Sequence, residues 1–310
     1  MKWITRAAIG SGVAAGVLLA VGTYRPAARA ATEVGPSSYD DALRFEVIAT
    51  DNLLVGPVDG RVIVALSRLN QSEPRLRIGR VVPSATPIFA VDVRNFQTGS
   101  VVVIDESAAS FPHPTLADLP PGDYHVQVVL EMNRDLKSPN APGNLYSRPQ
   151  TLSIPVENDP VIRLELTERV PDESLPADTD SLRFVRIRSA LLTAFHGRPI
   201  DLRAGIILPR GFEDEPDRLY PIRVHVGGYG TRYTRVEQLM RPGSAFRTTW
   251  LAEDTPRMIL VHLDGAGPYG DPYQVNSANN GPYGDAITQE LISYIADRFR
   301  GLVHPGSRVV

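Results

Sequence analysis

Four consecutive residues, Gly227-Gly228-Tyr229-Gly230, have the composition of a loop that could bind a developing negative charge. They follow directly after residues 220–226, a dense apolar segment that we expect to be a buried strand. Glycines let backbone N–H groups come close to a ligand, so Gly228 and Tyr229 are candidate donors of an oxyanion hole. A glycine cluster after a strand is also typical of a simple tight turn, and both interpretations stay open.

Two further loops follow expected strands and carry polar side chains that could contact a substrate. The first follows the apolar run at residues 258–263, and the second is the turn-rich run at residues 276–283. The candidates in these loops are Asp264, Asn279, Asn280 and Tyr283. Ordinary turn structure explains each loop equally well, so these interpretations also stay open.

The composition excludes several kinds of site. The 310 residues contain no cysteine, which rules out disulfides, thiol nucleophiles and cysteine-ligated metals. His113 and His125 have no second ligand at metal-binding spacing, and we expect no metal and no cofactor. The net charge of −3 gives no electrostatic reason to expect nucleic acid as a partner. With 43% hydrophobic and 22% charged residues, the chain resembles a globular protein in composition.

Residues 1–30 have the layout of a secretory signal peptide. Lys2 and Arg6 precede an apolar run over residues 7–24, and Ala28-Arg29-Ala30 offers a small-residue cleavage site. An uncleaved anchor is the alternative, because the run is close to the roughly 17–25 residues that a spanning helix needs. Cleavage would leave no stable membrane span. In both cases we expect the rest of the chain to be secreted or periplasmic.

Residues 31–170 contain short apolar segments separated by Pro, Gly, Asn and Asp, which predicts an all-β domain. The alternation of apolar and polar residues from Tyr124 to Leu130 indicates a strand with one more buried face. Short strands at fairly regular spacing favour an antiparallel sandwich. The expected strands cover residues 45–48, 61–66, 87–93, 100–104, 124–130 and 161–166.

An acidic, proline-bearing segment at residues 171–180 is the best candidate for a linker. In residues 181–310, expected strands alternate with crossover segments, which indicates an α/β sheet that is parallel in its centre. These strands cover residues 182–189, 202–209, 220–226 and 258–263. The sequence therefore predicts two domains, an N-terminal sandwich and a C-terminal α/β domain.

The segment at residues 285–300 predicts an amphipathic helix. Ile287, Leu291 and Ile295 recur every four residues on one face. Gly301 then follows as the expected left-handed cap of this helix. A further strand is expected to begin at residue 308.

Several segments together resemble the esterase D and S-formylglutathione hydrolase-like branch of the α/β-hydrolases. The resemblance is closest to a larger secreted form, in which a sandwich precedes the hydrolase domain. It implies that residues 181–310 are the N-terminal half of a hydrolase sheet, with the oxyanion-hole N–H supplied from Gly228 and Tyr229. The segments that carry it are 197–199, 207–212, 220–221, 227–230 and 276–301.

In this family the helix at residues 285–300 precedes a strand that ends in a Gly-x-Ser-x-Gly elbow, and the acid and histidine follow later in the chain. No Gly-x-Ser-x-Gly occurs in the 310 residues. We therefore expect the nucleophile, acid and histidine to lie beyond Val310, and we assign no catalytic residue. His225, His262 and His304 precede the expected elbow and are not candidates for the base.

Two functions follow as hypotheses. The first is the N-terminal part of a secreted serine carboxylic-ester hydrolase, acting on a small-molecule ester in its full-length form and inactive as written. The alternative is a non-catalytic secreted protein whose sandwich binds a carbohydrate or a protein. That alternative would require aromatic residues gathered on one face of the sandwich.

Overall fold

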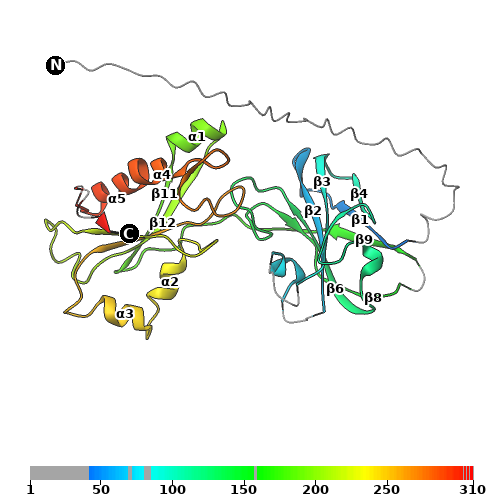
Figure 1. Ribbon diagram of the computed structural model, residues 1–310, viewed down its shortest axis with the longest axis horizontal. Coiled ribbons are helices and arrows are strands. Elements are labelled where there is room, and N and C mark those ends of the chain that lie inside the picture. Colours follow the sequence, from blue (N-terminus) through cyan, green and yellow to red (C-terminus); the bar gives the residue numbers. More distant parts are fainter. Residues whose placement is uncertain are drawn as a thin grey trace, which may run out of the picture. The chain divides into compact units, whose positions relative to one another are not determined.

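The structure, a computed structural model, describes residues 42–68, 72–79, 85–156, 159–302, 304, 306 and 308–309. The regular structure of these residues is mostly β-strand, with few and short helices (Figure 1). Among them, no helix combines the length and the apolar character that crossing a membrane requires. The predicted signal peptide at residues 1–30 lies outside the described residues.

The first half of the described chain forms two sheets. A three-stranded sheet has the order β4-β1-β9, and a larger sheet has the order β10-β7-β6-β2-β3-β5, with β8 also paired to β6. The strands are β1 (Arg44–Ala49), β2 (Val58–Ser67), β3 (Ile88–Phe96), β4 (Val101–Ile104), β5 (Ala109–Phe111), β6 (Gly122–Glu131), β7 (Leu145–Tyr146), β8 (Gln150–Ile154), β9 (Val161–Leu166) and β10 (Glu168–Arg169). Two short 3₁₀ turns, η1 (Pro74–Arg77) and η2 (Leu116–Asp118), lie in the connections.

Both of these sheets contribute to one apolar core. Phe45 and Val47 of β1 contact it from one sheet, and Val64 of β2 and Val128 of β6 contact it from the other. The pairings are antiparallel except between β1 and β9, which run parallel. All six strands expected in this region are present, so the prediction of a β-rich region is confirmed.

The second half contains a five-stranded sheet with the order β11-β12-β14-β13-β17. Its strands are β11 (Leu182–Arg188), β12 (Asp201–Ile207), β13 (Ile222–His225), β14 (Ile259–Leu263) and β17 (Arg308–Val309). β13 runs parallel to both β14 and β17, whereas β12 is antiparallel to both β11 and β14. The expectation of a sheet that is parallel in its centre is right for β13 and wrong for the β12–β14 pair.

Helices cover both faces of this sheet (Figure 1). Leu202, Ala204 and Ile206 of β12 share one core with the helices near residues 190–196 and 283–298. On the other face, Gly205 lets α2 pack directly on β12, since a Cβ there would lie 2.3 Å from the Tyr233 carbonyl oxygen. The helices are α1 (Ala190–His196), α2 (Arg235–Leu239), α3 (Ala245–Trp250), α4 (Tyr283–Asp285) and α5 (Ile292–Arg298), with a π-helical segment η3 (Ala286–Leu291) between the last two.

The two crossover connections around β13 and β14 lie on opposite faces of the sheet. The chain passes from β13 to β14 through α2 and α3, and from β14 to β17 through α4, η3 and α5. In open α/β sheets, such a reversal opens a crevice at the carboxyl ends of the strands, where ligands bind. The loops after β13 and β14 therefore form the candidate site.

The expected helix at residues 285–300 is present, but its cap differs from the prediction. The left-handed residue is Arg300, with φ of 59°, and not Gly301. Gly301 is needed for close packing instead, because a Cβ there would lie 2.5 Å from Ile222 Cδ1 and 2.9 Å from Ala296 Cα. The Gly301 N–H donates to the Ala296 carbonyl oxygen at 2.8 Å and so ends the helix.

Candidate functional site

The glycine cluster after β13 forms a tight turn. The Thr231 N–H donates to the Gly228 carbonyl oxygen at 2.9 Å, and Gly230 has φ of 69°, which suits the third position of a type II turn. Gly228 and Tyr229 are exposed, and neither N–H is a donor in any hydrogen bond among the described residues. The turn thus leaves free the two N–H groups that the sequence singled out, and their role as oxyanion donors stays a prediction.

Asp271 joins this turn to the loop that follows β14. Its Oδ2 accepts the Gly230 N–H at 2.8 Å, while its Oδ1 accepts the Tyr273 N–H at 2.8 Å and Gln274 Nε2 at 3.2 Å. The carboxyl group is buried, and the residues that it holds at 273 and 274 both have positive φ. Sequence reasoning missed Asp271, although an Asp-Pro pair in a glycine-rich loop is a recognised turn signal.

Asp264 is held in an ion pair and does not extend into solvent. Its side chain is 6% exposed, and Arg232 Nε donates to it at 2.6 Å. Arg232 also binds both carboxylate oxygens of Glu173, at 2.8 and 3.0 Å, so this network ties residue 173 of the predicted linker to the loop after β13. Burial raises the pKa of Asp264, and Arg232 opposes that rise. The main role of this carboxylate is to fix the two loops.

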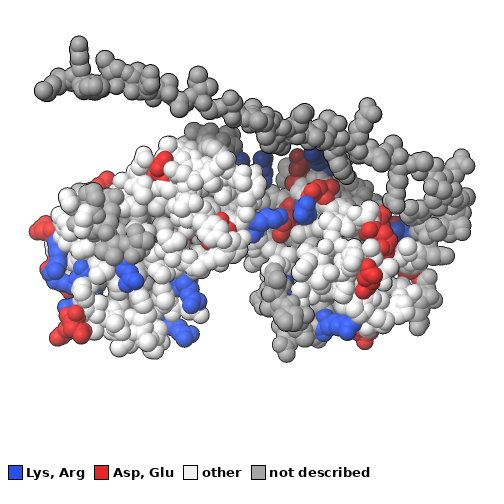
Figure 2. Space-filling model, in the orientation of Figure 1, with Lys and Arg blue, Asp and Glu red and all other residues white. Residues whose placement is uncertain are grey.

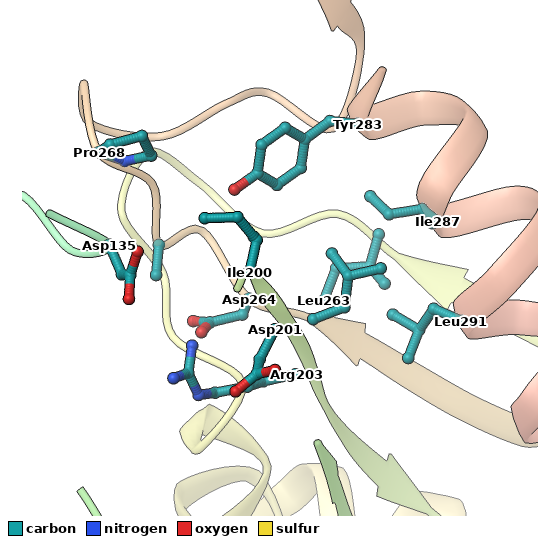
Figure 3. A pocket seen from close by; sticks show the side chains of 12 residues that line it. Asp135, Ile200, Asp201, Arg203, Leu263, Asp264, Pro268, Tyr283, Ile287 and Leu291 are labelled. Atoms are coloured by element: carbon teal, nitrogen blue, oxygen red, sulfur yellow. The ribbon is translucent and has the colours of Figure 1, made fainter. Parts of the chain in front are cut away.

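Asp264 and Tyr283 line one small cavity beside the sheet (Figure 3). Figure 3 shows the Tyr283 ring reaching from its helix with the hydroxyl directed toward Ile200. Burial raises the pKa of Tyr283 to about 12, which keeps the hydroxyl protonated as a donor. The cavity volume is about 30 Å³, enough for a water molecule and far below the roughly 300 Å³ of a small-ligand pocket. As it stands, this cavity does not accommodate an ester.

Asn279 and Asn280 lie apart from that cavity, in the turn between β15 (Asn276–Ser277) and β16 (Gly281–Pro282). Asn279 is exposed, and the Asn280 N–H donates to Ser277 Oγ at 3.0 Å. The Asn280 carbonyl oxygen lies 3.1 Å from His196 Nε2 of α1. The structure therefore brings together two of the four predicted loop residues, Asp264 and Tyr283, and places Asn280 against the end of α1 and Asn279 in solvent.

Two histidines lie side by side beneath the glycine turn. His225 of β13 and His262 of β14 are register partners, and their ring centroids are 4.8 Å apart. A Cβ on Gly227 would lie 3.2 Å from His262 Cε1, so the turn rests directly on this ring. Burial lowers the pKa of His262, which favours the neutral imidazole at neutral pH. No cluster of three or more metal-ligating side chains occurs among the described residues.

Comparisons with known proteins identify no family for the chain. No family model matches, and no curated protein matches. Among solved structures, the chain is similar to a ferulic acid esterase with 15% identity over 41% of this chain and 48% of that chain, at a TM-score of 0.34. A ferulic acid esterase from Anaeromyces mucronatus, in complex with ferulic acid, has 16% identity over 44% and 50%, at a TM-score of 0.26. A thermostable esterase has 10% identity over 86% and 69%, at a TM-score of 0.27.

The chain spans about half the length of the two ferulic acid esterases. All three solved structures are esterases, but at these TM-scores the likeness carries no argument for mechanism or substrate.

Proposed function

We propose that these 310 residues are the leading part of a two-domain, secreted serine carboxylic-ester hydrolase. In this proposal Gly228 and Tyr229 donate N–H groups to the oxyanion of the tetrahedral intermediate. The observation that carries the proposal is the free, exposed pair of N–H groups at the carboxyl end of β13.

The position of β17 supports this assignment. β17 pairs in parallel with β13 through Ile222↔Arg308 and Arg223↔Val309. A segment that continues in the direction of β17 would emerge at the sheet edge where the glycine turn lies. A nucleophile elbow at that place would put its serine beside the free N–H groups, as the chemistry of acyl transfer requires.

In this proposal the nucleophile comes from outside these residues. No Gly-x-Ser-x-Gly occurs among them, so we assign the serine, the acid and the histidine to sequence outside the 310 residues. By this reasoning, the 310-residue protein alone does not hydrolyse esters above background.

A proline substitution tests the oxyanion role. Tyr229 is the second residue of the turn, a position that proline favours, so Tyr229→Pro removes the N–H donor while fitting the backbone. In a protein extended through the elbow, we expect Tyr229→Pro to lower kcat about 100- to 1000-fold, the usual effect of losing one such donor. Tyr229→Ala is the matched control, because it removes the ring and keeps the N–H. Equal kcat values for the two variants would refute the assignment.

The alternative of a sandwich that binds a carbohydrate or a protein finds no support in the surface of β1–β10. Among the described residues of that region, the exposed large apolar side chains are Val55, Leu76, Val101, Val103 and Phe111. Only one of these is aromatic, and it stands alone. Basic and acidic side chains are mixed over the visible face, without a broad patch of one sign (Figure 2).

A further inference from the structure

Three exposed tyrosines gather on the two loops that form the candidate site. Tyr229, Tyr269 and Tyr273 are 70%, 73% and 64% exposed. Among the described residues, the next most exposed tyrosine is Tyr294 on α5, at only 38%. Large aromatic rings are usually well covered, so three of them exposed beside one another indicate a surface built for contact.

The Tyr229 ring contacts both Tyr273 and the backbone of the loop after β14. The ring centroids of Tyr229 and Tyr273 are 5.9 Å apart. The Tyr229 hydroxyl occupies the space next to Gly270, where a Cβ would lie 2.5 Å away, and Tyr269 is the residue before that glycine. Asp271 ties the backbone of both loops together through Gly230 and Tyr273. The Tyr229 and Tyr273 rings therefore lie close together before any ligand binds, which lowers the entropy cost of binding.

The two loop segments that bear the rings carry no free charge. Residues 226–231 and 265–275 include a single charged side chain, Asp271, and its carboxylate is buried and accepts three hydrogen bonds. What the loops expose is aromatic faces, tyrosine hydroxyls and backbone amides, together with the side chains of Val226 and Val275. A nucleic acid or another anion would need Arg or Lys here, and none is present in these segments.

We propose that Tyr229, Tyr269 and Tyr273 form a stacking surface for an uncharged carbohydrate ring. A pyranose presents a face of C–H groups to an aromatic ring, and its hydroxyl groups need neutral hydrogen-bonding partners at the edge. Tyrosine supplies both an apolar face and a polar tip. The rings stand open to solvent, which suits a sugar that stays partly hydrated as one unit of a longer chain.

This inference extends the proposed function, and it rests on that function only for the place of the sugar within the ester substrate. Tyr229 carries a ring on this surface and a backbone N–H in the proposed oxyanion hole, so a sugar bound here would be the part of the ester nearest the reacting carbonyl. Binding itself requires no nucleophile. The 310-residue protein can therefore be tested without hydrolysis.

Affinity electrophoresis of the full 310-residue protein tests the inference. The gels contain xylan, glucomannan, hydroxyethylcellulose or dextran as neutral probes, and polygalacturonate as an acidic one. We expect retardation by at least one neutral polysaccharide, and a two- to tenfold weaker apparent affinity when Tyr229, Tyr269 or Tyr273 is changed to Ala, as is usual for the loss of one aromatic contact. Tyr294→Ala is the matched control and should bind as the parent does.

The outcomes are separable. Three results would each overturn the inference. In the first, no neutral polysaccharide retards the protein, and in the second, only polygalacturonate does. In the third, none of the three loop variants weakens the retardation. Circular dichroism of each variant checks that the fold is retained, which we expect because these side chains are exposed. None of these results bears on the missing serine, so the ester-hydrolase proposal stands or falls on its own experiment.

Discussion

Removing the Asp271 carboxylate should loosen the two loops of the candidate site while leaving the rest of the protein intact. Asp271→Ala deprives the Gly230 N–H, the Tyr273 N–H and the Gln274 amide of their acceptor. A hydrogen bond to a charged group contributes about 1.5–3 kcal/mol. The released N–H groups lie on surface loops and can bind water, so we expect the loss to equal about one such bond.

That loss corresponds to a roughly ten- to hundredfold faster amide exchange within the loops. Hydrogen–deuterium exchange followed by mass spectrometry measures it in peptides that cover residues 226–234 and 268–275. Asp271→Asn should have an intermediate effect, because an amide keeps one acceptor oxygen and loses the other. Asp254→Ala is the matched control, since Asp254 is exposed and outside the site. Unchanged exchange in both loops of Asp271→Ala would refute the reasoning.

Three further predictions concern the sheet beneath the loops. Gly205→Ala should destabilise the fold by about 1–3 kcal/mol in denaturant unfolding, because its Cβ would lie 2.3 Å from the Tyr233 carbonyl oxygen; a loss below about 0.5 kcal/mol would be contrary evidence. His262 has a pKa lowered by burial, so the unfolded state binds its proton more tightly and stability should fall as pH drops below about 6.5. This pH dependence of stability should be smaller in His262→Gln, and the same pH profile in the variant and the parent would contradict the prediction. Arg232→Met should lower the free energy of unfolding by about 3 kcal/mol or more, because it leaves Asp264 buried without its partner. The Arg232→Met variant should lose stability as the pH rises above about 4, where the Asp264 carboxyl would ionise in the unfolded state. Adding Asp264→Asn to this variant should restore most of the lost stability.

The strands could be predicted wherever a long segment alternates or is continuously apolar. β6 is present as predicted and Leu130 lies in the core. The prediction of one more buried face is wrong, because Gln127 and Val129 on the opposite face are also fully buried, with Val129 packed in a second cluster beside Ile63. The short strands β5, β7, β8 and β10 could not be predicted in this way. Each has five residues or fewer, and β10, for example, consists of Glu168 and Arg169. Such strands exist because a neighbouring strand offers a free edge, which is a tertiary effect.

The short helices were missed for a related reason. α1, α2 and α3 have five to seven residues, too few to establish an apolar period. Two of them do begin with a readable signal, because Ser189 and Ser244 accept N–H groups of Leu192 and Arg247 as N-caps. The longer helical run after residue 283 was predicted because its apolar period extends over several turns.

The candidate site likewise has a part that the local sequence predicts and a part that only the fold reveals. The glycine turn is a local feature, so its residues could be identified from four adjacent letters of the sequence. The carboxylate that fixes the turn comes from Asp271, 41 positions from its partner Gly230, and no local pattern links the two. Asp264 could be recognised as a loop residue, but only the fold shows that Arg232 occupies its carboxylate.

We propose that the loop after β13 serves a serine nucleophile from outside these 310 residues. Labelling with a fluorophosphonate probe, which reacts with activated serines, tests this most directly. We predict no labelling of the 310-residue protein, and stoichiometric labelling of a protein extended in frame through a Gly-x-Ser-x-Gly elbow. Labelling of the 310-residue protein would contradict the claim that the nucleophile lies elsewhere. An extended, folded protein that stays unlabelled would contradict the assignment as a serine ester hydrolase.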